Sequence, residues 1–353
     1  MAEIKPNVSE TPFPNAAWNM PPNGYINTST TPATGVGDSS HFINCMSVAI
    51  DPLDRLWILD NGRPLSSDGT LVPASPGGPK LVAVNLTSNE VALTIVLPPT
   101  AAYPDSYLND VRIDLRANVT ESGQGIAYIT DSSSTGRNAI VVVDIGTQEA
   151  WRHLEGHPSV RPTEEHFKQV WGEPVYSVPG PNMPFSFDST GIDGLAFTQD
   201  ADTLFWSVTG SRYLYSIPTE RLRDRSQTSE IRAQAAVTNH GEKGCSDGLM
   251  QDTNNYVYAG SFEQNAINVY NSLNGTVTTY VRDPRIGWTD SMWIANDQNI
   301  YFIQNQLWRT KSYFPGTDRR VKPYTLWRVP TADGGKRVSP HFGYVRDYIE
   351  DSG

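Results

Sequence analysis

The stretch IDGLAF (192–197), TLFWSV (203–208) and YLYSI (213–217) decides the fold, because it sets three short apolar runs in a row with a few polar residues between them. Runs rich in Val, Ile, Tyr and Trp, bounded by Gly, Asp, Asn and Pro, are typical of β-strands joined by turns. The first run opens with an acid and a small residue, Asp193 and Gly194. The stretch predicts one small antiparallel sheet.

The same three-strand unit recurs along the chain. Its first strand returns as CMSVAID (45–51), NDVRID (109–114), SDGLMQD (246–252) and TDSMWIAN (289–296). A second and a third strand follow each copy, as in RLWILD (55–60) with KLVAVN (80–85) and YVYAGS (256–261) with AINVYN (266–271). Sheets this small bury their faces by packing radially. The repeat predicts an all-β propeller forming a single domain over residues 1–353, rather than an open β-sandwich.

Two insertions interrupt the repeat, at residues 61–79 and 151–190, and we expect them to form loops at the channel mouth. The second is rich in Pro and Gly, and we expect it to act as a lid.

The charge of the chain limits the kinds of partner that it can bind. The net charge is −11 and the sequence pI is about 5.0. Neither nucleic acid nor a membrane is expected as a partner, and we expect a monomer that binds a small molecule.

Five N-x-S/T sequons are glycosylation candidates, although a chain rich in Asn, Ser and Thr supplies several by chance. They begin at Asn7, Asn27, Asn85, Asn118 and Asn274. The first residues, MAEIKPNVSE, are polar and contain no secretory signal. We expect a secreted protein whose signal segment is absent from this chain.

Acids and amides recur at the start of the innermost strands, where a propeller opens its channel. The candidate catalytic residues are Asn109, Asp193, Asp247 and Asp290. Carboxylates crowded in a cleft shift one another's pKa values and can move protons. The alternative is structural, because Asp before a small residue often caps a turn by accepting backbone N–H bonds.

Aromatic and polar residues in the adjoining loops predict a small-molecule pocket. The candidate ligand-binding residues are Tyr103, Tyr107, Trp171, Phe187, Thr190, His240 and Trp288. The alternative for the aromatic residues is packing between blades, and the alternative for His240 is an exposed loop.

Cys45 and Cys245 are the only cysteines, and each precedes an innermost strand. Secretion favours a disulfide between them. Their blades are about three apart in order, and a disulfide needs Cα atoms within about 7 Å. The pair is a disulfide candidate that requires the loops to lean over the axis.

Several of these segments resemble the Yellow/major royal jelly protein family, in particular its microbial branch. The resemblance is carried by HFINCMSVAIDPLDRLWILDNG (41–62), SYLNDVRIDL (106–115), GIDGLAF (191–197) and VRDPRIGWTDSMWIAN (281–296). It implies a six-bladed propeller. Five complete units are present, so we expect a sixth blade that is short or is completed by the C-terminal segment 337–350. The family includes pigment-pathway isomerases, ligand-binding proteins and members of secondary metabolism.

LNDVRID (108–114) and CSDGL (245–249) also resemble the metal-site segments of gluconolactonase and regucalcin-like propellers. Asn109 and Asp247 match two of the ligands there, whereas Thr190 and Cys45 stand at the other two positions. A Cys is a poor ligand for a hard cation such as calcium. We therefore expect no metal or other cofactor, with a divalent cation as the alternative.

We predict a cofactor-independent enzyme of secondary metabolism that acts on a partly apolar metabolite. The expected reaction is isomerisation, tautomerisation or cyclisation, including a hetero-Diels–Alder addition. Such reactions need mainly orientation and hydrogen bonds to developing charge. The alternatives are a metal-dependent lactonase-like hydrolase and a non-catalytic secreted ligand-binding protein.

Overall fold

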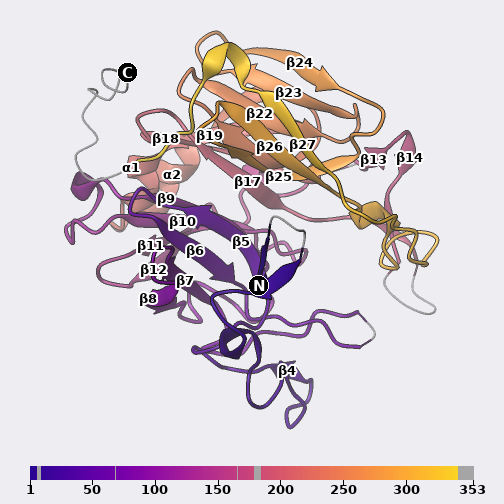
Figure 1. Ribbon diagram of the computed structural model, residues 1–353. Helices are drawn as coiled ribbons and strands as arrows, with labels where there is room; N and C mark the ends of the chain where they lie inside the picture. The colour runs from indigo at the N-terminus through magenta and orange to yellow at the C-terminus, as the bar shows by residue number, and fades with distance from the viewer. Residues whose placement is uncertain (6–8, 68, 165, 179–183, 341–353) are drawn as a thin grey trace. The chain divides into compact units, whose positions relative to one another are not determined.

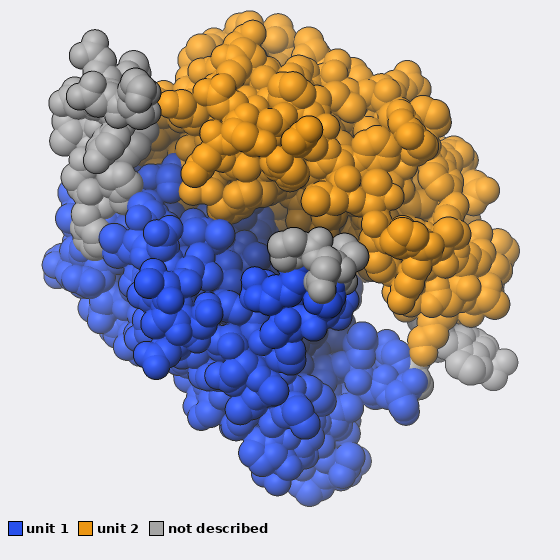
Figure 2. All heavy atoms as spheres, in the orientation of Figure 1, with its two compact units in different colours: residues 1–135, 140–153, 339–353 blue, residues 136–139, 154–338 orange. Residues whose placement is uncertain are grey.

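The computed structural model describes residues 1–5, 9–67, 69–164, 166–178 and 184–340. The chain divides into two compact units, which Figure 2 shows in different colours. Unit 1 consists of residues 1–135, 140–153 and 339–353, and unit 2 consists of residues 136–139 and 154–338. None of the helices in the described ranges is long and apolar enough to cross a membrane.

Unit 1 contains two four-stranded antiparallel sheets, each of which follows chain order from strand to neighbouring strand (Figure 1). The first sheet consists of β5 (Cys45–Ile50), β6 (Arg55–Asp60), β7 (Lys80–Asn85) and β8 (Glu90–Val96). The second consists of β9 (Leu108–Asp114), β10 (Ile126–Asp131), β11 (Ala139–Asp144) and β12 (Ala150–His153). Their innermost strands, β5 and β9, are neighbours, and a core that includes Trp57, Leu81, Val111 and Val141 lies between the sheets.

Unit 2 contains three further sheets of the same kind. The first consists of β17 (Ile192–Phe197), β18 (Thr203–Val208), β19 (Tyr213–Pro218) and β20 (Thr238–Glu242). The second consists of β21 (Ser246–Gln251), β22 (Tyr256–Ser261), β23 (Ala266–Asn271) and β24 (Thr276–Arg282). The third consists of β25 (Trp288–Ile294), β26 (Asn299–Asn305) and β27 (Leu326–Pro330). The innermost strands β17, β21 and β25 lie side by side in that order.

Short elements connect these sheets. The helices are α1 (Thr219–Arg223) and α2 (Ser229–Ala235), with one-turn 3₁₀ helices η1 (Ala17–Asn19), η2 (Ala117–Val119), η3 (Pro158–Val160), η4 (Leu307–Arg309) and η5 (Ala332–Gly334). Four two-stranded pairs complete the described structure: β1 (Ala2–Ile4) with β2 (Glu10–Pro12), β3 (Ile26–Asn27) with β4 (Thr34–Gly35), β13 (Gln169–Val170) with β14 (Glu173–Pro174), and β15 (Tyr176–Ser177) with β16 (Ser186–Phe187).

The all-β propeller prediction is confirmed, but the number of blades differs from the prediction. Five blade sheets form in the described residues, whereas the resemblance implied six. After β27 the chain turns through η5 instead of adding a fourth strand to the last sheet. The described part of the segment 337–350 makes single contacts: Arg337 forms an isolated bridge with Asp252, and the Leu115 N–H donates to the Pro340 carbonyl at 3.1 Å. Residues 341–350 lie outside the described residues.

Candidate functional site

A β-bulge opens the innermost strand of each blade sheet in unit 2, and the recurrent acid lies inside that bulge. The pairing of each innermost strand with the next strand shifts register between Ile192 and Leu195, between Ser246 and Leu249 and between Thr289 and Met292. The residues at the three shifts are Asp193 with Gly194, Asp247 with Gly248 and Asp290 with Ser291. A bulge re-aims a side chain and increases local twist. The sequence motif therefore corresponds to a β-bulge in the backbone of each innermost strand of unit 2.

Close packing between neighbouring innermost strands explains why glycine follows the acid at positions 194 and 248. A Cβ on Gly194 would lie 2.5 Å from the carbonyl oxygen of Asp247, and a Cβ on Gly248 would clash with the carbonyl oxygen of Asp290. The bulges of neighbouring innermost strands are thus in close contact, and only glycine leaves room for that approach.

The three acids of unit 2 are bonded within the unit. Asp193 is buried and accepts from the Thr209 hydroxyl at 3.0 Å. Asp247 is also buried and accepts from the indole N–H of Trp288 at 2.6 Å. The Asn305 amide lies 3.4 Å from a carboxylate oxygen of Asp290. These bonds fix Asp193 and Asp247 to side chains of the scaffold, and the catalytic and turn-cap roles of both acids stay predictions.

In unit 1, Asn109 and Asp110 occupy the equivalent bulge at the start of β9, where Leu108 and Val111 pair with Asp131 and Ile129. The Asp110 carboxylate accepts from Ser47 at 2.9 Å and from Arg112 at 2.8 Å. Asn109 is partly buried on the same strand. Its convergence with the acids of unit 2 stays a prediction.

The two ligand-binding candidates in unit 1 belong to its scaffold. The backbone N–H of Tyr107 donates to Asp131 at 2.9 Å. The guanidinium of Arg152 lies over the ring of Tyr103, 4.4 Å from its centre, and also donates to Asp131 at 2.9 Å. The buried carboxylate of Asp131 therefore holds Tyr107 directly and Tyr103 through Arg152.

The insertion at 151–190 supplies unit 2 with a buried ion pair that sequence reasoning missed. Lys168 is 2% exposed, and its Nζ lies 2.8 Å from a carboxylate oxygen of Asp188. Asp188 also accepts from the N–H and hydroxyl of Thr190 at 2.9 and 2.5 Å, and from the Tyr313 hydroxyl at 2.8 Å. Burial alone would raise the pKa of the Asp188 carboxyl, but Lys168 and the Thr190 hydrogen bonds hold it well below its usual range. Asp188 is therefore a permanent carboxylate at neutral pH.

Tyr313 also lines a pocket of about 480 Å³ within unit 2. Residues 173–176, Phe185 and residues within the segment 308–319 form its walls. Most of the lining is apolar or aromatic, and polar groups come from Glu173, Tyr313 and Arg319. Phe185 and Phe314 of the lining meet edge to face, with ring centres 5.5 Å apart. An aromatic pocket with few polar groups is the usual composition of a small-molecule site.

Two of the predicted ligand-binding residues support this pocket from outside its lining. Phe187 stacks on Tyr176, which lines the pocket, with ring centres 5.1 Å apart. Trp171 meets Trp308, another lining residue, edge to face at 5.3 Å. Thr190 donates to Asp188, and Asp188 in turn accepts from the lining residue Tyr313.

Two other ligand-binding candidates have structural positions instead. Trp288 is 1% exposed and stacks on Phe262 with ring centres 4.6 Å apart, so it is a core residue. His240 lies on the outermost strand of its sheet, where its ring nitrogens are 2.7 Å from the Ser216 hydroxyl and 2.9 Å from the Tyr270 hydroxyl. Trp288 was expected in a loop and lies on β25, and His240 lies on β20, so their roles in ligand binding stay a prediction.

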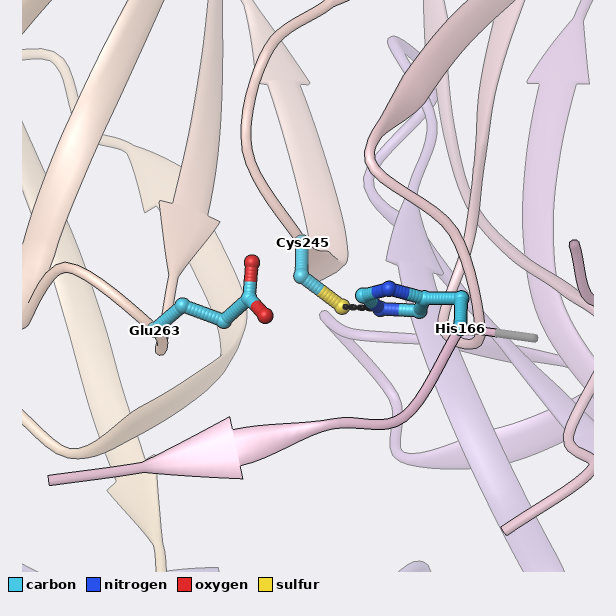
Figure 3. A group of neighbouring side chains, drawn as sticks. All are labelled: His166, Cys245 and Glu263. Carbon is cyan, nitrogen blue, oxygen red and sulfur yellow. Dashed lines mark hydrogen bonds between the residues drawn. The ribbon is translucent and has the colours of Figure 1, made fainter. Parts of the chain in front are cut away.

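Cys45 and Cys245 are both free cysteines, so the candidate disulfide is not formed. The Cys245 thiol has local partners, since its Sγ lies 3.1 Å from the carbonyl oxygen of Thr209 and 3.4 Å from Nε2 of His166 (Figure 3). Glu263 completes a group of three side chains whose donor atoms lie within 4.8 Å of one another. Arg212 holds the Glu263 carboxylate with two bonds, at 2.7 and 2.8 Å.

Among the sequons, the side chains of Asn118 and Asn274 are exposed, whereas those of Asn27 and Asn85 are half-buried. Asn7 lies outside the described residues. The exposed pair are thus the sterically open acceptor sites of the described chain.

The fold and the pocket together define a β-propeller protein with an aromatic small-molecule-type pocket in its second unit. Residues 43–337 match the family model described as "Major royal jelly protein". The chain therefore belongs to the major royal jelly protein family. It is similar to major royal jelly protein 7 of Apis mellifera, with 22% identity over 209 residues, which are 59% of this chain and 39% of that relative.

Similar solved structures are propellers with low sequence identity. One is a luciferin-regenerating enzyme, with a TM-score of 0.47, 13% identity, and coverage of 85% of this chain and 96% of that one. Another is a gluconolactonase from Xanthomonas campestris, with a TM-score of 0.44, 13% identity, and coverage of 84% and 75%.

Proposed function

We propose that this protein is an enzyme of small-molecule metabolism that binds a partly apolar metabolite in the unit 2 pocket and rearranges it. The proposed reaction is isomerisation, tautomerisation or cyclisation, with hetero-Diels–Alder addition as the cyclisation of most interest. The observation that carries the proposal is the pocket itself, which aromatic residues line together with Tyr313 and Arg319.

The aromatic wall would hold the apolar part of the metabolite in a reactive conformation. Orientation alone supplies much of the acceleration that a unimolecular or pericyclic reaction needs. The rings are already paired with one another, as in the Phe185–Phe314 contact, so little reorganisation accompanies binding.

The polar end of the pocket would stabilise negative charge that develops on a substrate oxygen. Arg319 is a permanent cation, and its Nη2 donates to the Phe314 carbonyl at 2.9 Å, which fixes its position. Tyr313 is oriented by Asp188 at 2.8 Å. In this proposal Arg319 donates to the substrate oxygen. Tyr313, whose hydroxyl hydrogen is donated to Asp188, offers its hydroxyl oxygen as an acceptor to a substrate hydroxyl, and Asp188 and Lys168 are positioning residues. Groups preorganised in this way are the largest single contribution in many enzymes.

The test is a mass comparison. An extract of the producing organism is incubated with the protein and with Tyr313→Phe, and metabolites are followed by liquid chromatography with mass spectrometry. The proposal expects a product with the mass of its precursor, or with the summed mass of two precursors, that depends on Tyr313. Products heavier by one water would support hydrolysis, and binding without any conversion would support a carrier; both results contradict the proposal.

A second candidate function is a metal-dependent hydrolase, favoured by the group of His166, Cys245 and Glu263. A divalent ion held by three protein ligands can activate a water molecule. Under this candidate, the product is heavier than its precursor by one water and a chelator abolishes its formation, whereas a product of unchanged mass supports the rearrangement.

A further inference from the structure

Three donor side chains of different chemistry meet in unit 2. His166 comes from the insertion, Cys245 directly precedes β21, and Glu263 lies in the turn between β22 and β23 (Figure 3). One ligand atom from each lies within 4.8 Å of the others. We propose that these three residues bind a zinc ion. The proposal does not depend on the reaction proposed for the pocket.

The separations agree with shared coordination. Zinc binds sulfur at about 2.3 Å and nitrogen at about 2.0–2.1 Å in a tetrahedron, which puts two such ligands about 3.5 Å apart. The Cys245 Sγ and His166 Nε2 are 3.4 Å apart. The thiol and the imidazole therefore lie at the separation of co-ligands before any ion enters.

Two contacts orient the Cys245 sulfur. The thiol donates to the Thr209 carbonyl at 3.1 Å, and Nε2 of His166 lies 3.4 Å from the Sγ, where it donates or accepts according to its tautomer. An ion between the sulfur and the nitrogen would replace the second contact, because both atoms would then ligate it.

The donor set selects the class of ion. Cys245 offers a sulfur, His166 a ring nitrogen and Glu263 a carboxylate oxygen. Calcium and magnesium prefer oxygen ligands, whereas a sulfur, nitrogen and carboxylate set is typical of zinc.

The charges near the site belong to the proposal. The thiolate that forms on binding would carry one negative charge toward the divalent cation, and the Glu263 carboxylate would be shared between the cation and Arg212. Arg212 grips Glu263 with two bonds, at 2.7 and 2.8 Å, and would orient it as an outer partner of the site. Lys168 is paired with Asp188 at 2.8 Å, so its charge is already compensated.

Zinc would also connect the ion site with the pocket. His166 is two residues from Lys168, and Cys245 packs in one cluster with Val175 and Trp308, which line the pocket. An ion on His166 would therefore hold in place the segment that carries the buried ion pair. Three protein ligands leave a fourth position for water.

The experiment measures zinc binding directly. Purified full-length protein is stripped with a chelator, dialysed, and titrated with Zn²⁺ against a chromophoric competitor. The proposal expects one tightly bound equivalent, retained in the control Cys45→Ser and lost in Cys245→Ser and in Glu263→Gln. Co²⁺ added to the stripped protein should give a sulfur-to-cobalt absorption band that disappears with Cys245→Ser alone among the cysteine variants.

Melting temperatures of all variants without metal separate unfolding from ligand loss. Absence of a tight equivalent in the wild type would overturn the proposal. Retention of that equivalent in a folded Cys245→Ser protein, or its loss in Cys45→Ser, would overturn it equally.

Discussion

The innermost strands of unit 1 and unit 2 begin with the same motif, yet the two regions use their acids differently. In unit 1 two buried acids at the ends of second strands are each paired with a cation of the same sheet: Asp60 with Lys80 at 2.9 Å and Asp131 with Arg152 at 2.9 Å. Both carboxylates also accept backbone N–H bonds, from Asn44 and Tyr107 respectively. These buried ion pairs stabilise the blade sheets of unit 1.

In unit 2 the insertion contains a buried ion pair that also contacts the pocket. Asp188 is paired with Lys168, and it accepts a hydrogen bond from Tyr313, which lines the pocket. The insertion likewise brings His166 to Cys245. The repeat therefore builds the blades, whereas in the proposed function the segment that interrupts the repeat positions the reactive groups.

The largest expected effect belongs to unit 1. Asp60→Ala leaves Lys80 buried without its carboxylate and removes the acceptor of the Ile43, Asn44 and Gly62 N–H groups. Breaking a buried pair from one side costs about 3–5 kcal/mol. We expect that loss in the free energy of unfolding, measured by urea denaturation. Asp318→Ala, which breaks the exposed pair with Arg320, should change stability little; an equal loss in both variants would contradict this reading of unit 1.

Tyr313→Phe should have the next largest effect, and on turnover rather than on stability. Removing the Tyr313 hydroxyl deletes the acceptor offered to the substrate and a hydrogen bond to the charged Asp188, which lowers kcat about 10–160-fold. The matched control is Tyr103→Phe in unit 1, for which we expect wild-type kcat. Steady-state kinetics on the substrate found in the extract decide the comparison. Equal losses in both variants would place the chemistry outside the unit 2 pocket.

Asp188→Asn tests the positioning role against its counterpart Asp131→Asn. Loss of a hydrogen bond to a charged group costs about 1.5–3 kcal/mol, which is about 10–160-fold in rate. We expect this loss in kcat for Asp188→Asn, with KM little changed, and none for Asp131→Asn after correction for folded protein.

The pH dependence of turnover in the wild type and in Asp188→Asn tests the charge of Asp188 separately. The pKa of Asp188 lies well below its usual range, so this carboxyl contributes no loss of wild-type turnover between pH 7 and pH 5. A wild-type decline over that interval that disappears in Asp188→Asn would show that Asp188 titrates there, contrary to the account.

His240→Gln should give the smallest effect, and on stability alone. Burial lowers the pKa of His240, so the folded protein binds this proton less readily than the unfolded chain does. Its contribution to stability is therefore present above the unfolded pKa near 6.5 and is lost as the pH falls through the folded value. Thermal melts at pH 7 and pH 5 should show a smaller acid loss in His240→Gln than in the wild type; the same or a larger loss would contradict this.

The sequence was sufficient for the blades because strand alternation and turn residues are local signals. All five predicted copies of the unit, from β5 to β27, form sheets with the expected strands. The acid motif was read as chemistry first, whereas the structure assigns it to bulges and to close backbone contact at Gly194 and Gly248.

The candidate site could not be derived in the same way, because its contacts are distant in sequence. Asp188 and Tyr313 are 125 residues apart, and His166 and Cys245 are 79 apart. The insertion carries no repeat to align them, and Lys168 and Asp188 are ordinary charged residues in a polar segment. The one available signal was a His, a Lys and aromatic residues together in an insertion of unusual length.

The location of the ligand is the central claim, and hydrogen exchange measured by mass spectrometry tests it most directly. Amide protection reports where a bound molecule suppresses local opening. With the substrate from the extract bound, we predict added protection in residues 173–178 and 308–319 of unit 2, with residues 103–110 of unit 1 unchanged. Added protection confined to residues 103–110 would contradict the account.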